Sequence, residues 1–159
     1  TELLIENNVV YHTKTGGFHQ HYGKENRIVN NIFAFAEEFI LQRTREEEHL
    51  SFTFERNIVY FKNGRLLGSN WNNGNFRMDQ NVYWNGGSAF GFAGRSPDQW
   101  RAEGQDTRSI IADPLFLDPA NDDYRLKPES PAWQLGFKRI PVGKIGCYDD
   151  PLRASWPLE

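Results

Sequence analysis

The sequence lacks the features that define several large classes of protein. It contains one cysteine, Cys147, so no disulfide can form within its 159 residues. Lys and Arg number 18 against 21 Asp and Glu, and this balance lacks the basic excess of a nucleic-acid-binding domain. No apolar run approaches the ~20 residues that a membrane-spanning helix needs. We therefore expect neither nucleic acid nor a membrane as a partner.

Residues that favour helices are also scarce. Met78 is the only methionine, and Ala and Leu are sparse in the middle of the chain, where Val, Ile and aromatic residues are plentiful. Aromatics make up 14% of the chain, which argues against disorder and favours strands. Asn occurs 14 times, as often as Gly, and it favours turns and left-handed backbone positions. The composition predicts one strand-rich domain that turns often.

A repeat is anchored on asparagine. In each copy an Asn precedes a β-branched residue and then bulky apolar or aromatic residues. The anchors are Asn8, Asn31, Asn57 and Asn81, separated by 23, 26 and 24 residues. Such a period is typical of solenoids, because one short unit cannot bury its apolar side chains alone and must stack on its neighbours.

Each repeat contains two strand-like stretches around its anchor. Those before the anchors are residues 3–5, 27–29, 51–54 and 75–78. Those about ten residues after an anchor are residues 18–22, 40–44 and 67–71, with a shorter echo at 90–92. No repeat has a long helical pattern.

These patterns predict an all-β fold, a right-handed parallel β-helix of about four coils of ~25 residues over residues 1–95. A β-sandwich is the competing fold, but it does not require Asn at a fixed phase. In a β-helix the anchor Asn can hydrogen-bond to the Asn of the next coil at the same corner. We therefore interpret the four anchors as structural residues.

The remainder, residues 96–159, has a different composition. Ser96 and Gln99 form a capping-box pattern with Pro97 at the first helical position, which predicts a short helix over residues 97–103. Seven of the eight prolines lie at or beyond Pro114, and Pro cannot donate to a strand ladder. This segment should end the stack and wrap it as a C-terminal cap in the same domain.

The first coil shows no such cap, because residues 2–5 begin inside a repeat. An uncovered strand edge invites pairing with another chain. We therefore expect preceding coils or a second copy to cover this edge.

Residues 15–23, 30–33, 42–45 and 48–52, together with the ending at 113–136, resemble the right-handed β-helix repeat proteins of bacterial polysaccharide breakdown. The nearest relatives by this resemblance are glycoside hydrolases of family 141 type. The resemblance implies a carbohydrate-active protein, secreted or periplasmic, that acts on a plant or microbial polysaccharide or oligosaccharide. It also implies that this chain corresponds to the C-terminal third of such proteins.

Candidate site residues lie on the second strand of each coil, where alternate side chains point to opposite faces. If Phe18, Ile40 and Leu67 stack inward, then His21, Arg43 and Asn70 form one outward row. A slip of one residue exchanges the faces. In that alternative register His19 stands beside Gln42, and Gln20 stands beside Arg43.

An outward row of His, Arg and Asn suits a sugar-binding face. Imidazole exchanges a proton near neutral pH, and guanidinium holds carboxylates or hydroxyls with a fixed geometry. The proposed substrate-binding residues are His19, Gln42, Arg45, Asn70 and Trp71. Trp71 offers a flat surface to a sugar ring, although it could equally pack in the core. His19 and His21 lack a third metal ligand, so we expect neither a metal nor another cofactor.

We expect a glycoside hydrolase, with a polysaccharide lyase or a non-catalytic glycan-binding scaffold as the alternatives. The proposed catalytic residues are His21, Arg43 and Glu48. A glycoside hydrolase usually needs two carboxylates ~5–10 Å apart, and Glu48 is the best candidate for one of them. A polysaccharide lyase needs a base and a cation, for which His21 with Arg43 would serve. A non-catalytic glycan-binding scaffold needs only the polar row and Trp71.

Overall fold

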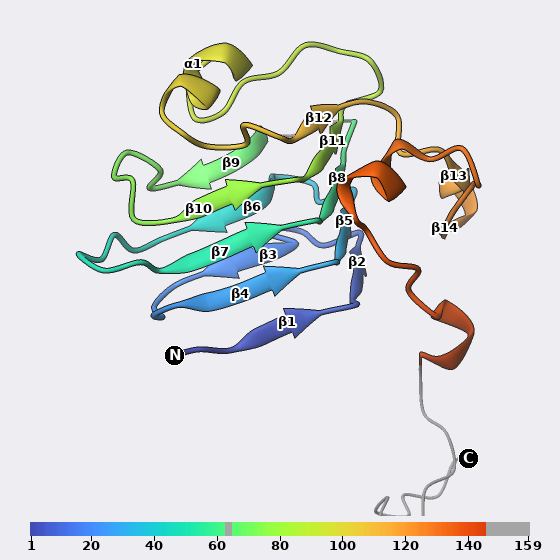
Figure 1. Ribbon diagram of the computed structural model, residues 1–159, viewed down its shortest axis with the longest axis horizontal. Coiled ribbons are helices and arrows are strands. Elements are labelled where there is room, and N and C mark those ends of the chain that lie inside the picture. The colour runs from blue at the N-terminus through green and yellow to red at the C-terminus, as the bar shows by residue number, and fades with distance from the viewer. Residues whose placement is uncertain (63–64, 146–159) are drawn as a thin grey trace, which may run out of the picture.

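The computed structural model describes residues 1–62 and 65–145, and it shows a parallel β-solenoid of about four turns (Figure 1). Three parallel sheets run along the stack. The first contains β1 (Leu4–Glu6), β4 (Asn26–Val29), β7 (Phe52–Glu55) and β10 (Arg77–Asp79). The second contains β2 (Val9–Tyr11), β5 (Ile32–Ala34), β8 (Ile58–Tyr60), β11 (Val82–Trp84) and β12 (Ile110–Ile111). The third contains β3 (Phe18–Gln20), β6 (Phe39–Arg43) and β9 (Arg65–Ser69).

The predicted parallel β-helix is therefore confirmed, with one local exception. The echo at residues 90–92 adds no strand to the third sheet. Phe92 instead forms an isolated antiparallel bridge with Arg95. The third sheet accordingly ends one turn earlier than the first sheet and two turns earlier than the second.

The corner between the first and second sheets carries the asparagine ladder that the repeat predicted. The Asn31 Oδ1 atom accepts hydrogen bonds from the backbone N–H and the Nδ2 of Asn8, at 3.0 and 2.9 Å. Asn57 does the same for Asn31 at 2.9 and 3.0 Å, and Asn81 for Asn57 at 2.9 and 3.4 Å. The side chains of the last three anchors are completely buried.

Left-handed backbone residues produce the turn at this corner. The residue before each anchor has a φ between 52° and 59°; these residues are Asn7, Asn30, Arg56 and Gln80. Asn tolerates the left-handed conformation better than most residues. Where Arg56 and Gln80 occupy the position instead, the hydrogen bonds of the following anchor stabilise the left-handed backbone.

The last turn replaces the next asparagine with two other acceptors. Ser109 Oγ accepts the backbone N–H of Asn81 at 2.8 Å, and Asp106 Oδ1 accepts its Nδ2 at 3.0 Å. The Asp106 carboxylate also accepts from the Tyr83 hydroxyl and from Trp100 Nε1. Asp106 is only 3% exposed, and burial raises its pKa despite these hydrogen bonds.

Helix α1 (Pro97–Ala102) lies over this end of the stack (Figure 1). The Ser96–Gln99 capping box is present, as predicted. The ring of the buried Trp100 stacks on Phe76 and Phe92, which close the top of the interior core.

The proline-rich segment lies along a flank of the solenoid. It contains β13 (Phe116–Asp118), η1 (Pro119–Asn121), β14 (Asp123–Leu126), η2 (Pro131–Leu135) and η3 (Val142–Lys144). Its apolar residues form a second core with the outer face of the second sheet, which includes Ile32, Ile58 and Val82. The strands β5 and β8 are consequently buried on both faces, which explains their continuous apolar sequences. The remainder of the expected cap, with Cys147, lies outside the described residues.

At the opposite end, β1, β2 and β3 form the outer edges of the three sheets. Leu3 and Leu4 are 58% and 53% exposed there. The coverage of this end by further coils or a second copy stays a prediction. Among the residues that the structure describes, no helix has the length and apolar character to cross a membrane.

Replacement of Asn57 by Ala should lower the free energy of unfolding by about 3 kcal/mol or more. The substitution leaves the buried Asn31 N–H without its acceptor and the Ile28 carbonyl without its donor. Urea unfolding followed by circular dichroism measures the change. Asn72→Ala, at an exposed position after β9, is the matched control and should change stability by less than about 0.5 kcal/mol. Equal effects of the two variants would contradict a stabilising ladder.

Asp106 should make stability depend on pH. Its raised folded-state pKa lies above the ~3.9 of an unfolded Asp, so folding favours the protonated form. The stabilisation is present below pH ~4 and is lost as the pH rises through the folded pKa. Asp106→Asn does not ionise, so the stability of the native protein minus that of the variant should shrink between pH ~4 and ~7. Urea unfolding of both proteins across this range checks the sign, and a difference that grows with pH would refute it.

Candidate functional site

The register of the third sheet decides which candidate residues face outward. The structure pairs Phe18 with Leu41 and Leu67, and it pairs His19 with Gln42 and Gly68. Gln20 lies beside Arg43. The alternative register is therefore the correct one, and the expected row of His21, Arg43 and Asn70 is wrong. Inward-pointing polar residues in the third sheet made the two registers equally compatible with the sequence.

Arg43 lies inside the solenoid and is completely buried. Its Nη1 donates to the Asn70 carbonyl at 3.1 Å and to Asn73 Oδ1 at 2.6 Å, and its Nη2 donates to Ser51 Oγ at 3.2 Å. Its guanidinium also lies over the ring of Phe76. Burial lowers the Arg43 pKa, an effect that nearby Glu46 and Glu47 oppose. These contacts join consecutive turns and leave no surface for a substrate.

Trp71 is also buried, at 1% exposure. Its Nε1 donates to the Gly68 carbonyl at 2.8 Å, and its ring meets Phe52 and Phe76 edge to face. Trp71 therefore packs in the core, and the prediction that its ring binds a sugar is wrong.

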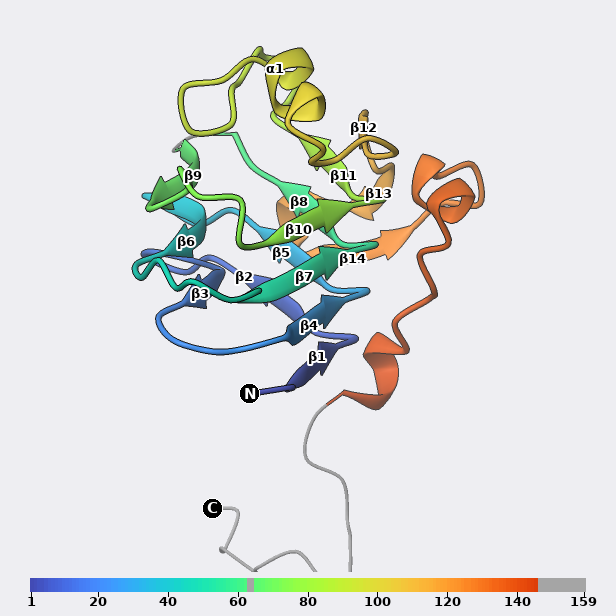
Figure 2. The ribbon, with the colours of Figure 1, turned by 60° about the vertical axis from the view of Figure 1, so that its left-hand side comes forward.

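The structure brings several other candidates together on one surface, which we call the histidine face. It comprises His19, His21, Tyr22, Gln42, Thr44 and Arg45, from β3, β6 and the residues that follow them. Figure 2 shows β3 and β6 side by side in the lower part of the stack. Asn70 adjoins this face, because its Nδ2 donates to the Thr44 carbonyl at 3.0 Å.

One hydroxyl connects the two histidines. Thr44 Oγ1 lies 2.9 Å from His19 Nε2 and 2.9 Å from His21 Nδ1. A hydroxyl has one proton to donate and two lone pairs to accept, so it can bond to a neutral or a charged imidazole on either side. The arrangement orients both rings and leaves the other nitrogen of each available to a ligand.

Tyr22 forms the aromatic part of the histidine face and is 63% exposed. The His21 ring meets it edge to face, with centroids 4.7 Å apart. The Arg45 guanidinium lies over the Tyr22 ring at 5.5 Å. A planar apolar surface, a proton-exchanging group and a cation therefore meet at the end of β3.

A second aromatic–arginine pair lies at the beginning of β6 and β9. The Arg65 guanidinium lies 4.8 Å from the centroid of the Phe39 ring, which covers Gly68. A Cβ atom at residue 68 would stand 2.5 Å from this ring, so only glycine allows the close approach. The Phe39 ring can therefore lie flat against the backbone of Gly68 on the outward face.

The carboxylates lie beside the histidine face. Glu48 is exposed, and the described residues show no hydrogen bond between its side chain and either histidine. Glu47, which the sequence did not distinguish, accepts the Gly23 N–H at 3.1 Å and lies 3.5 Å from His49 Nε2. In the part of the chain that the structure describes, no three His, Cys, Asp or Glu residues are grouped to hold a metal ion.

A second polar cluster has no signal in the sequence, because its members are 110 residues apart. Asp122 Oδ1 lies 2.8 Å from His12 Nε2 and accepts the Tyr124 hydroxyl at 2.9 Å. Burial and this hydrogen bond raise the Tyr124 pKa well above its ordinary value. The cluster adjoins a hollow of about 320 Å³ lined by Phe35, Glu37 and Lys62, among others.

Comparison with known proteins gives no match at any level. The chain matches no protein-family model, no curated protein and no solved structure. The function must therefore be inferred from the residues and the geometry described above.

Arg43→Ala should test the structural interpretation of Arg43. Loss of its hydrogen bonds leaves buried acceptors without a donor and should lower the free energy of unfolding by about 2–4 kcal/mol. Thermal and urea unfolding measure the change. Arg77→Ala, on the exposed face of β10, is the matched control and should be nearly neutral. An Arg43→Ala variant as stable as Arg77→Ala would show that the buried guanidinium does not stabilise the fold.

Proposed function

We propose that this chain is the polysaccharide-binding β-helix part of a carbohydrate-active protein, and that the histidine face is its binding surface. The observation that carries the proposal is the exposed Tyr22 ring flanked by His21 and Arg45. An aromatic ring packs against the apolar face of a sugar, while the neighbouring polar groups bond to its hydroxyls or carboxylate.

The shape of the histidine face favours a polymer over a small ligand. It continues along β6 from Arg45 to the Phe39–Arg65 pair at the beginning of the strand. The five steps from Phe39 to Thr44 correspond to about 16 Å at ~3.3 Å per residue. An open surface of this length, with aromatic–arginine pairs towards both ends, suits an extended oligosaccharide.

The cations favour an acidic polysaccharide. Arg45 belongs to the histidine face and Arg65 to the neighbouring Phe39–Arg65 pair, and neither arginine forms a salt bridge within the described residues. A guanidinium that lies over an aromatic ring retains donors for a uronate carboxylate. We therefore favour a uronate-containing polymer, whereas the sequence resemblance supports only a polysaccharide in general.

Among catalytic functions, β-elimination has more support than hydrolysis. His21 could take the C5 proton adjacent to a uronate carboxylate while Arg45 neutralises that carboxylate, a role that buried Arg43 does not fill. The C4=C5 double bond then forms as the C4–O glycosidic bond breaks, and the leaving oxygen takes a proton from water. Glycoside hydrolysis, which the sequence resemblance favours, needs two facing carboxylates. Glu47 and Glu48 both lie after β6, on the same side of any bound sugar. Hydrolysis would therefore need a second carboxylate, from another part of the protein, on the opposite side of the glycosidic bond.

Tyr22→Ala should weaken binding to polygalacturonate at least about tenfold, equivalent to about 1.4 kcal/mol, because it removes the aromatic platform. Affinity electrophoresis through gels with and without the polymer measures the change. Tyr11→Ala is the matched control, since Tyr11 is also exposed but belongs to β2. Equal retardation of both variants, or no retardation of the native protein, would contradict the proposed surface.

Incubation of the native protein with polygalacturonate distinguishes the enzymatic alternatives. A lyase generates unsaturated products that absorb ultraviolet light, and His21→Ala should abolish that signal. A hydrolase generates reducing ends alone, and Glu47→Gln and Glu48→Gln identify the carboxylate that it uses. Binding without either product identifies a non-catalytic module.

A further inference from the structure

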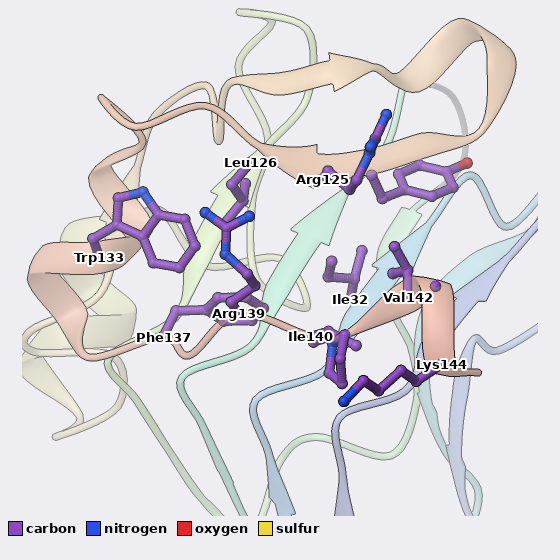
Figure 3. Close-up of a pocket in the computed structure, with 12 residues that line it drawn as sticks. Ile32, Arg125, Leu126, Trp133, Phe137, Arg139, Ile140, Val142 and Lys144 are labelled. Atoms are coloured by element: carbon purple, nitrogen blue, oxygen red, sulfur yellow. The ribbon is translucent and has the colours of Figure 1, made fainter.

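A separate cavity of about 220 Å³ lies where the C-terminal segment crosses the outer face of the second sheet (Figure 3). Its lining comes from β5, β14, η2 and η3, including Ile32, Leu126, Trp133, Ile140 and Val142. Ile32 is more than 90 residues away in sequence from the other residues that line the cavity. The cavity lies on a different sheet from the histidine face.

Hydrogen bonds hold the cavity open in a defined shape. The backbone N–H of Lys138 donates to Asn30 Oδ1 at 2.6 Å, and Asn30 Nδ2 donates to the Lys138 carbonyl at 3.0 Å. Trp133 Nε1 donates to the Lys127 carbonyl at 3.0 Å, which fixes the indole ring at one side. The corner that precedes β5 and the residue that follows β14 therefore position the walls.

The volume of the cavity and its apolar walls suit a small apolar group of a ligand. Aliphatic side chains form one side, and the rings of Trp133 and Phe137 form the other. An apolar cavity of ~150 Å³ is large enough to bind benzene. A cavity of this larger volume therefore accommodates one aromatic ring with a short substituent.

The rim is cationic although the chain as a whole carries a net charge of −3. Arg139 and Lys144 line the cavity together with no acidic side chain. In Figure 3, Arg139 extends towards Trp133, whereas Lys144 extends along the side of Ile140. Within the described residues, neither cation forms a salt bridge, whereas Arg125, which also lines the cavity, is paired with Asp123.

We infer that this cavity binds a small carboxylate that bears a single aromatic ring. The ring occupies the space between Trp133 and the aliphatic wall, and the carboxylate lies at the rim that carries Arg139 and Lys144. Charge complementarity selects an anion, because these two exposed cations have no acidic partner among the residues that the structure describes. The inference is independent of the proposed polysaccharide surface.

Isothermal titration of the full chain with hydrocinnamate tests the inference, with the neutral hydrocinnamamide as the ligand control. The acid should bind with a submillimolar Kd, and the amide should bind at least about tenfold more weakly. NMR shifts should appear in the methyl groups of Ile32, Ile140 and Val142, which locate the ligand.

The double variant Arg139→Gln with Lys144→Gln should weaken hydrocinnamate binding about tenfold and leave amide binding unchanged. Both side chains are exposed, so the fold should tolerate the change, and circular dichroism verifies this. Lys138→Gln is the matched control, because Lys138 is an exposed neighbour that does not line the cavity. The inference is overturned if the acid does not bind at millimolar concentration, if the amide binds equally well, or if Lys138→Gln weakens binding as much as the double variant.

Discussion

The structure depends on a column of hydrogen bonds between asparagines at one corner of the solenoid. Each bond links an anchor side chain to the backbone N–H of the anchor one turn earlier. A buried polar group is costly unless it is paired, so the ladder is stable only when successive turns are in register. The ladder therefore fixes the alignment of the first and second sheets, which meet at this corner. The final turn preserves it with Ser109 and Asp106, at the expense of a buried carboxylate.

Burial of the second sheet on both faces is the next consequence. Its inner face contributes to the interior core, and its outer face carries the hairpin and 3-10 turns of the C-terminal segment. Sheet and segment are fastened through Asn30, which precedes a ladder residue and bonds to Lys138. The same contact that closes the second core also shapes the cationic cavity. In the part that the structure describes, the C-terminal segment does not cover the outward faces of the first and third sheets. The outward face of the third sheet carries the histidine face.

The third sheet shows how a polar side chain can stabilise the interior of a narrow solenoid. Arg43 points inward and bonds to the turns after β6 and β9, while Gln42 points outward beside His19. Because Arg43 satisfies acceptors of the turns, its burial is compatible with a stable fold. The cation on the histidine face is consequently Arg45, which follows the strand and lies over Tyr22.

The sequence by itself determined the class of fold. The spacing of Asn8, Asn31, Asn57 and Asn81 predicted both the period and the corner, because a local pattern repeated at fixed intervals has one efficient way to bury its apolar residues. The Ser96 capping box likewise predicted α1 from local interactions alone. The approximate location of the candidate surface, on the strands that contain His19 and Gln42, followed from the same repeat.

Only the tertiary structure decided which residues form sites. A one-residue register difference reverses every side chain of a strand, and the pattern at residues 40–44 is compatible with both choices. The burial of Trp71, the His12–Asp122 pair and the cavity beside Trp133 depend on contacts between distant segments. No local pattern encodes such contacts, because they arise from how the C-terminal segment packs along the stacked turns.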